Sequence, residues 1–356
     1  MGKRIKIGTF NLKNLALPGV DYYPDRQWSE PQYARKIHWT AGMLQRMDAD
    51  LVGFQEVFHT DALREAVAQS SAFEGSQVFA PGAPANGPVS GPRVGLVTRL
   101  RLFSAPRSIE TFPEGVDLSF TDPDTGESMA VAIDRFSRPV LRADVELVSG
   151  VIAAVFVVHL KSKRPSLTEA EEGTDPRTND LFAPALGSAR SLIRRAAEAA
   201  ALRRLIIDEL EGTRMPVIVL GDLNDDLHAV TNTMIEGEDP LRFYGGLDAE
   251  QNLVARRRRW DVRLYNATAM HMRKSPRDTI YTHVYNGEYG TLDHIYLSEE
   301  FYQGAPRNQR LGDLEYVHCF NDHLVDQSMT FETRFNDASD HGQLVVTLDM
   351  FEPTPA

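Results

Sequence analysis

The segment VIVLGDLND at residues 217–225 joins a run of apolar, largely β-branched residues to a short polar cluster. Pro216 precedes the run and Gly221 closes it, which is typical of a strand buried on both faces. Residues two apart on an extended segment share a face, so the Asp222 carboxylate and the Asn224 amide point into one small volume. A strand-terminating turn uses the same residue types, so this segment alone supports both interpretations.

Other strand-like segments also carry polar residues where their apolar bodies begin or end. Strand boundaries are where α/β architectures place binding and catalytic residues. Carboxylates and amides supply oxygen ligands for hard cations, and imidazoles supply acid–base groups. The residues concerned are Asn11, Glu56, His159, Lys161, Asp293, His294, Asp340 and His341.

The order of these residues is specific. Asn11, Glu56, His159, the GDLN of 221–224, Asp293 and the SDH of 339–341 together resemble the motifs of the endonuclease/exonuclease/phosphatase superfamily. That group includes DNase I-like nucleases, apurinic endonucleases, inositol-polyphosphate 5-phosphatases and neutral sphingomyelinases. The resemblance extends from near residue 7 to near residue 348. It implies a four-layer α/β sandwich, in which two mixed β-sheets pack face to face between outer helices.

Two features depart from the superfamily pattern. The last motif continues as Gly342-Gln343, where a residue followed by proline is more usual. The segment 161–187 is longer and more acidic than in compact members. Both departures affect the expected rim of the substrate site rather than the expected chemistry.

The resemblance also implies roles for individual residues in a metal-dependent phosphoesterase. Asp222 would orient or deprotonate the attacking water, and Asn224 would hold a phosphate oxygen. His341 would pair with Asp293, and His159 would contact the scissile phosphate. Lys161 is either a phosphate contact or a surface cation, whereas His294 is expected to bond locally. The expected metal ligands, direct or through water, are Asn11, Glu56, Asp293 and Asp340.

Mg²⁺ is the expected cofactor because it prefers oxygen ligands and keeps several waters, and Mn²⁺ could replace it at such a site. The resemblance to metal-dependent phosphoesterases also implies a phosphate-containing substrate. Attack of an activated water on DNA or RNA, as in a nuclease, is the first interpretation. The alternative is a phosphatase or phosphodiesterase acting on a small or lipid-derived phosphate of the inositol phosphate or sphingomyelin type. A non-catalytic scaffold is a remote third, because every motif position is filled.

Charge bears on the choice of substrate. The 356 residues carry a formal net charge of −12, which disfavours broad coating of nucleic acid through a basic surface. Local phosphate contacts are still possible, because a bound divalent cation supplies positive charge. The run ARRRRWDV at 255–262 is the one concentrated basic segment. It predicts either a solvated edge or an element that steers a polyanion toward the site.

The pattern along the chain predicts a single domain over 1–356. Strand-like segments occur at 4–12, 50–57, 93–99, 139–147, 150–160, 216–223, 291–298 and 343–350. Helical patterns occupy 31–47 and 187–210, and the charged residues of the second are expected to form a solvated face. Segments rich in proline, glycine or acidic residues predict long rim loops near 81–92 and 163–186.

The sequence also bears on location. Cys319 is the only cysteine, which excludes an internal disulfide framework and is consistent with a reducing compartment. The first residues show no apolar core of a signal peptide, and no stretch is long enough to span a bilayer. These features predict a cytoplasmic protein without a membrane anchor. The oligomeric state is left open.

Overall fold

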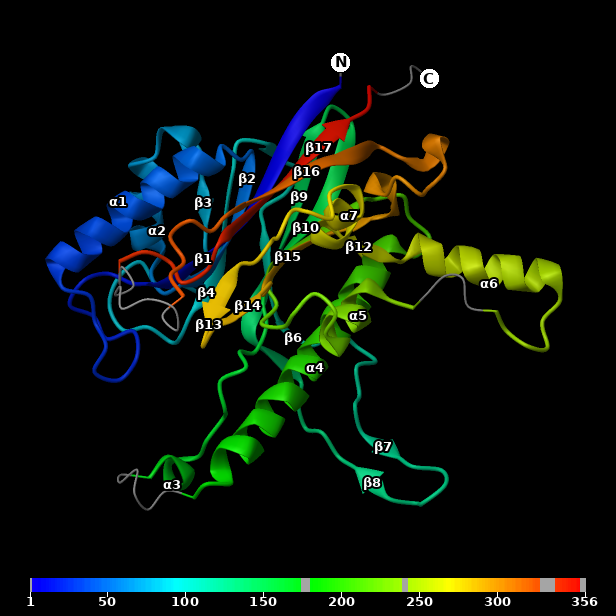
Figure 1. Cartoon of the computed structure of the whole chain (residues 1–356), viewed down its shortest axis with the longest axis horizontal. Coiled ribbons are helices and arrows are strands. Elements are labelled where there is room, and N and C mark those ends of the chain that lie inside the picture. Colours follow the sequence, from blue (N-terminus) through cyan, green and yellow to red (C-terminus); the bar gives the residue numbers. More distant parts are fainter. Residues whose placement is uncertain (1, 174–179, 239–242, 327–336, 353–356) are drawn as a thin grey trace.

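Two mixed β-sheets form the centre of the molecule in the computed structural model, which describes residues 2–173, 180–238, 243–326 and 337–352 (Figure 1). The first sheet contains, in spatial order, β16 (Gly312–Phe320), β17 (Gln343–Met350), β1 (Lys3–Leu15), β2 (Leu51–Val57), β4 (Arg93–Thr98) and β3 (Val78–Phe79). The second contains β12 (Leu264–Asn266), β15 (Asp293–Ser298), β11 (Val217–Asp222), β10 (Val151–His159), β9 (Arg135–Val148) and β5 (Arg101–Leu102).

Smaller elements surround these sheets. The strand β6 (Arg107–Thr111) pairs with β9, and two hairpins are formed by β7 (Phe120–Thr121) with β8 (Ser128–Met129) and by β13 (His283–Tyr285) with β14 (Glu288–Gly290). The helices are α1 (Glu30–Met47), α2 (Thr60–Ala68), α3 (Glu169–Glu172), α4 (Ala183–Leu210), α5 (Val230–Glu236), α6 (Ala249–Asp261) and α7 (Ala267–Lys274). None of the described helices is both long and apolar enough to cross a bilayer.

The two sheets pack face to face through a continuous apolar layer that includes Leu96 of the first sheet and Leu220 of the second. Helices α1 and α2 cover the outer face of the first sheet through a cluster around Phe54. Helices α4 and α5 cover the outer face of the second sheet through a cluster around Phe156. Figure 1 shows α1 and α2 on one side of the strands and α4 and α5 toward the other. The expected four-layer sandwich is therefore confirmed.

Alternation along the central strands carries polar residues to one end of this apolar layer. Ile7 of β1 faces the layer, and Asn11 is on the same face because it follows Ile7 by an even number of residues. In β11, Leu220 faces the layer and Asp222 follows two residues later. His159 in β10 and Asp293 in β15 are likewise two residues from a residue that faces the layer.

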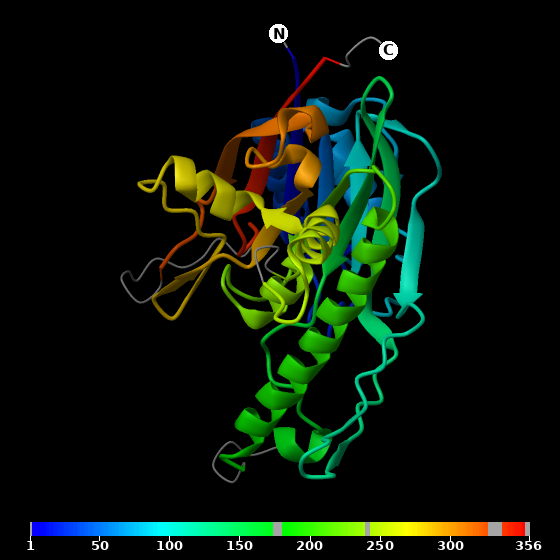
Figure 2. The ribbon, with the colours of Figure 1, turned by 90° about the vertical axis from the view of Figure 1, so that its right-hand side faces the viewer.

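The described part of the chain agrees with the expected elements except at some boundaries. The segment 81–92 is a loop, as expected. In the segment 163–186, α3 forms a short helix and α4 begins at Ala183, because Pro184 is compatible with the first turn of a helix. Residues 174–179 lie outside the described residues. Helix α4 extends beyond the ends of the strands in Figures 1 and 2.

Gly221 is required by the close approach of β11 to β10. Its φ is 147°, and a Cβ atom at this position would lie 2.0 Å from the carbonyl oxygen of Val158. We expect Gly221→Ala to lower the free energy of unfolding by about 3 kcal/mol, measured by urea denaturation. Gly42→Ala in α1 is the matched control, because nothing lies within 4 Å of the added Cβ. It should stabilise the helix by about 0.5–1 kcal/mol, and equal effects of the two substitutions would contradict this explanation.

Candidate active site

Side chains from both sheets meet at one end of the inter-sheet layer. Asn11 of the first sheet donates from Nδ2 to Asp222 Oδ2 of the second at 3.0 Å. The Nε2 atoms of His159 and His341 lie 3.5 and 3.9 Å from the same oxygen. All four residues are at most 8% exposed. Segments from distant parts of the chain therefore share one buried polar centre.

His341 is oriented by its neighbours. Its Nδ1 lies 2.7 Å from Asp293 Oδ2, and its backbone N–H donates to Ser339 Oγ at 3.0 Å. The Ser339 hydroxyl in turn donates to the carbonyl oxygen of Asn11 at 2.7 Å. Asp293 also lies directly across from Asp222 in the pairing of β15 with β11. This arrangement turns Nε2 of His341 toward Asp222, where it can gain or lose a proton.

Glu56 and Asp340 flank this centre. Glu56 accepts the backbone N–H of Asn14 at 2.8 Å. Burial raises the pKa of Glu56, and repulsion by Asp340 raises it further. Burial would also raise the pKa of Asp340, but the positive charges of His341 and Lys13 outweigh it and lower that pKa. The negative charge of Glu56 also raises the pKa of Asp222, after the larger effects of burial, His341, Asp293 and Asn224.

Unusual backbone conformations surround the site. Lys13, Asn14, Glu56 and Asn224 have φ values of 49°, 58°, 61° and 55°. Alternation along β2 would place Glu56 on the outer face together with Phe54, and the positive φ takes it out of this alternation. Such conformations cost roughly 1–3 kcal/mol per residue and cluster at functional sites.

Asn224 and Lys161 lie at the ends of neighbouring strands. The Asn224 backbone N–H donates to Asp222 Oδ1 at 2.8 Å, and its Nδ2 donates to the carbonyl oxygen of Leu160 at 3.0 Å. Lys161 is half-buried, and its Nζ donates to Ser162 Oγ at 3.3 Å. His294 is fully buried, and its ring bonds to the side chains of Asn232 and Asn266, in agreement with the local role expected for it.

The pKa values of the titratable groups at the site are shifted in different directions. Burial raises the pKa of Asp222 to about 7, with His341 lowering it and Asp293 raising it. Burial would lower the pKa of His341, but Asp293 and Asp222 outweigh it and raise that pKa well above its usual value. Burial and then the charge of Arg138 lower the pKa of His159. The centre thus combines a carboxyl group that titrates near neutrality with one cationic and one neutral imidazole.

The residues present suit a divalent cation. Asp222, Asp293 and His341 each offer a ligand atom, and these atoms lie within 4.8 Å of one another. Asp293 Oδ1 is buried and has no hydrogen-bond partner in the described part of the chain. Carboxylate oxygens are preferred ligands of hard cations such as Mg²⁺. With Glu56 and Asp340 beside them, these groups fit an oxygen-rich metal centre.

The raised pKa values predict how stability depends on pH without metal. Because the folded state holds protons on Asp222 and His341 more tightly than the unfolded state, these groups lose stabilising free energy as pH rises. For Asp222 the window is from its ordinary pKa of 3.8 to about 7. In EDTA, we expect Asp222→Asn to be more stable than the wild type at pH 8 by about 2–4 kcal/mol.

Thermal melting at pH 5 and pH 8 checks this prediction. At pH 5 the wild-type carboxyl group is largely protonated, so the advantage of Asp222→Asn should shrink. Mg²⁺ should reduce the advantage at pH 8, because a bound cation compensates the buried charge. A stability difference between the two proteins that is independent of pH would contradict the assigned pKa shift.

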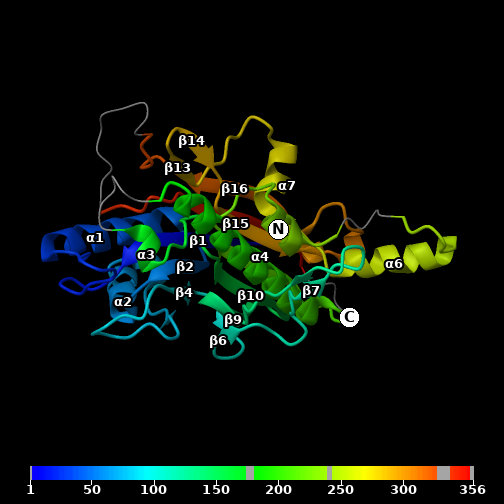
Figure 3. The ribbon, with the colours of Figure 1, turned by 90° about the horizontal axis from the view of Figure 1, so that it is seen from below.

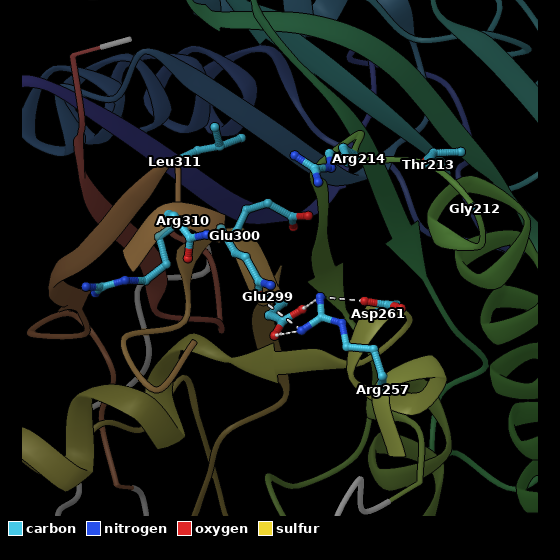
Figure 4. Close-up of a pocket in the computed structure, with 11 residues that line it drawn as sticks. Gly212, Thr213, Arg214, Arg257, Asp261, Glu299, Glu300, Arg310 and Leu311 are labelled. Atoms are coloured by element: carbon cyan, nitrogen blue, oxygen red, sulfur yellow. Dashed lines mark hydrogen bonds and ion pairs between the residues drawn. The ribbon is translucent and has the colours of Figure 1, made fainter. Parts of the chain in front are cut away.

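A separate cavity of about 460 Å³ lies at the opposite end of β11 and β15 (Figure 4). Arg214 precedes β11 and Glu299 follows β15, so a strand length of roughly 17 Å separates this cavity from Asp222 and Asp293. In this cavity Arg257 pairs with Glu299 at 3.0 Å and with Asp261 at 2.6 Å. The cavity is therefore distinct from the candidate active site.

The basic run 255–262 lies mostly in α6, which projects from the body in Figures 1 and 3. Besides Arg257, Arg258 pairs with Glu211 at 2.6 Å and Arg259 pairs with Glu238 at 2.8 Å. These partners neutralise much of the run. The structure therefore matches the solvated-edge interpretation and offers no support for polyanion steering by this segment.

The expectation of a solvated charged face on α4 is wrong for two residues. Arg195 and Glu198 are only 5% and 0% exposed. Arg195 contacts Asp225 at 3.1 Å and the carbonyl oxygen of Lys161 at 3.2 Å, so it connects two loops at the site. The signal was present in the sequence, because Arg195 and Glu198 share the helical stripe of Ala199 and Leu202, at i, i+3, i+4 and i+7.

Lys36 of α1 is a further buried ionisable residue, and no motif in the sequence pointed to it. Its side chain is fully buried, its Nζ has no hydrogen-bond partner among the described residues, and it lies 4.9 Å from the ring centroid of Trp28. Burial, aided by Lys13, lowers the pKa of Lys36 to about 7. Its position four residues before Thr40, which is also buried, indicates the apolar face of the helix.

Solved structures share this fold. An endonuclease/exonuclease/phosphatase from Bacteroides vulgatus has a TM-score of 0.53 and 14% identity, over 98% of this chain and 100% of that one. D. rerio TDP2 complexed with single strand DNA product has a TM-score of 0.52 and 16% identity, over 98% of this chain and 99% of that one. The mannosyl-6-phosphatase Bt3783 of Bacteroides thetaiotaomicron VPI-5482 has a TM-score of 0.51 and 14% identity, over 97% of this chain and 99% of that one. At these identities the similarity shows the fold alone.

No curated protein matches the chain in sequence. A family model does, however, and it is described as the Endonuclease/Exonuclease/phosphatase family. It matches residues 9–341, a range that includes Asn11, Asp222 and His341. Members of this family are generally phosphoester hydrolases that depend on a divalent metal. The match covers nearly the whole chain, and the chain therefore belongs to the endonuclease/exonuclease/phosphatase family.

Proposed function

We propose that the chain is a Mg²⁺-dependent phosphodiesterase that hydrolyses its substrate by in-line attack of an activated water. The observation that carries this proposal is the position of Asp222. Its Oδ2 faces the Nε2 atoms of His159 and His341 within 3.9 Å, beside the Asp293–His341 pair. A carboxyl group with a pKa near 7 can act as a general base at physiological pH.

Each residue has a part in this proposal. Asp222 orients the water and takes its proton. His341, held by Asp293, donates a proton or a hydrogen bond to the oxygen that leaves. His159 contacts the scissile phosphate, and Asn224 holds one of its oxygens. When bound, Mg²⁺ supplies the positive charge that stabilises the developing negative charge. The residues assigned to hold it are Asn11, Glu56, Asp293 and Asp340.

Nucleic acid is the first candidate substrate. The fold shared with D. rerio TDP2, which is complexed with single strand DNA product, supports testing DNA and RNA first. A small phosphoester is the second candidate, and the ion pairs of Arg257, Arg258 and Arg259 favour it because they neutralise three of the four arginines of the most basic segment.

A substrate panel tests the function. Plasmid DNA, RNA, bis(4-nitrophenyl) phosphate, inositol phosphates and sphingomyelin should each be incubated with the protein and Mg²⁺. We expect hydrolysis of at least one diester, and the preferred substrate separates the two candidates. Failure to hydrolyse any phosphoester with either Mg²⁺ or Mn²⁺ would contradict the proposed function.

A further inference from the structure

Arg138 lies beside the proposed active site and has no part in the proposed reaction. It belongs to β9, and its Nη1 donates to the carbonyl oxygen of Leu160 at 3.0 Å. The same oxygen accepts a hydrogen bond from Asn224 Nδ2 at 3.0 Å, so the two donors lie within about 6 Å of each other. Arg138 therefore borders the residue assigned to a phosphate oxygen.

The guanidinium of Arg138 is available to a ligand. Within the described residues, its only other side-chain hydrogen bond is a long one, 3.4 Å, to Ser137 Oγ, and no carboxylate forms an ion pair with it. The nearby Arg142 on the same strand is instead paired with Glu209 and Asp144. A guanidinium has five N–H donors and matches the geometry of phosphate, so a half-buried arginine without an acidic partner is suited to bind an anion.

Lys161 supplies a second cation next to Arg138. Its Nζ contacts Ser162 Oγ at 3.3 Å and the carbonyl oxygen of Arg164 at 3.4 Å, and within the described chain it has no carboxylate partner. Lys161 follows Leu160, the residue whose carbonyl oxygen Arg138 contacts. Both cationic residues are therefore held at the segment that follows β10, where burial and then the charge of Arg138 lower the pKa of Lys161.

Glu198 of α4 holds the backbone of both segments. One carboxylate oxygen accepts the N–H of Ser137 at 2.8 Å, and the other accepts the N–H of Lys161 at 2.7 Å. Because Glu198 is fully buried, water does not replace these hydrogen bonds. A single carboxylate thus sets the relative position of the chain at Arg138 and at Lys161.

We propose that Arg138 and Lys161 form a subsite for a second phosphate of the substrate, and that Glu198 is a positioning residue for both. The inference rests on the proposed function and deepens it. It selects substrates in which another phosphate lies next to the scissile diester, as in a polynucleotide or a dinucleotide with a terminal phosphate, over isolated diesters.

Turnover of thymidine dinucleotides phosphorylated at the 5′ end, at the 3′ end, or at neither end tests the subsite. The wild type should prefer one phosphorylated form, and Arg138→Gln should reduce that preference about 10- to 100-fold, as expected for loss of a charge-assisted hydrogen bond to phosphate. Arg138→Lys should retain part of it. Arg135→Gln is the matched control, because Arg135 is an exposed residue of the same strand. Equal loss on all three dinucleotides in Arg138→Gln would overturn the proposal.

Glu198→Gln tests the positioning role. The amide can accept only one of the two backbone hydrogen bonds, so the preference for the phosphorylated dinucleotide should fall at least about fivefold. The melting temperature is measured in parallel, because a purely structural role would lower it without changing the preference. That second result would exclude Glu198 as a positioning residue.

Binding separates this proposal from the proposed function. Calorimetry with Mg²⁺ compares thymidine 3′,5′-bisphosphate with thymidine 5′-monophosphate, in the Asp222→Asn protein with and without Arg138→Gln. Tighter binding of the bisphosphate that disappears with Arg138→Gln supports the subsite even where the wild type hydrolyses no dinucleotide, a result that counts against the proposed function instead. Equal affinities for the two nucleotides in both proteins would overturn the subsite.

Discussion

Replacement of Asp222 by asparagine is expected to lower kcat/KM by about 10³-fold or more while the protein remains folded. The amide cannot accept the proton of the attacking water, and it offers a weaker ligand to a cation. The fold should persist because Asp222 lies at the end of β11, where its substitution removes a buried charge rather than apolar contacts. Steady-state hydrolysis of the preferred substrate and far-ultraviolet circular dichroism measure the two effects.

Asp226→Asn is the matched control for this substitution. Asp226 belongs to the loop that follows Asp222, but its side chain is 55% exposed and pairs with Lys163 at 2.9 Å. The change should alter kcat/KM by less than about threefold, because an exposed ion pair contributes little. If the Asp222→Asn protein kept activity near that of this control, Asp222 would not be the general base.

Removal of divalent cations is expected to reduce hydrolysis to the background rate, and Mg²⁺ should restore it. Asp222, Asp293 and His341 place their ligand atoms within 4.8 Å of one another, and without a cation the two carboxylates would repel a phosphate. The measurement is activity after dialysis against EDTA, followed by titration with Mg²⁺ or Mn²⁺. Full activity after exhaustive chelation would contradict the proposed mechanism.

Asp293→Asn tests whether Asp293 is one of the groups that hold the cation. It keeps the shape of the residue that contacts His341 Nδ1 at 2.7 Å but removes one negative charge from the cluster. The concentration of Mg²⁺ needed for half-maximal activity should rise by about 10- to 100-fold. An unchanged Mg²⁺ requirement would place the cation away from Asp293, nearer to Glu56 and Asp340.

Much of the fold and of the candidate site could be predicted because it depends on local geometry. A strand alternates its faces with a period of two, so the sequence of 217–225 already indicated the direction of Asp222 at the end of a buried strand, whereas Asn224 lies beyond β11 with a φ of 55°. The same rule located His159 and Asp293 at strand ends. The order of these residues along the chain then indicated the family and its layered architecture.

Contacts between distant elements were beyond this reasoning. The positive φ of Glu56 takes it out of the alternation of β2, and no local sequence pattern predicts such a conformation at a glutamate. The pairing of the 255–262 arginines with Glu211, Glu238 and Glu299 depends on how α6 lies against other segments. Because of it, a run that looks basic in the sequence is largely neutralised.

The sequence by itself therefore determined which residues end the central strands and which chemistry their side chains can perform. Only the tertiary structure decided that Glu198, from the middle of a long helix, holds the chain at Ser137 and Lys161, and that Asn11 of one sheet meets Asp222 of the other. The physical reason is range. Backbone geometry specifies the direction of a side chain over a few residues, whereas packing of whole layers specifies which distant side chains meet.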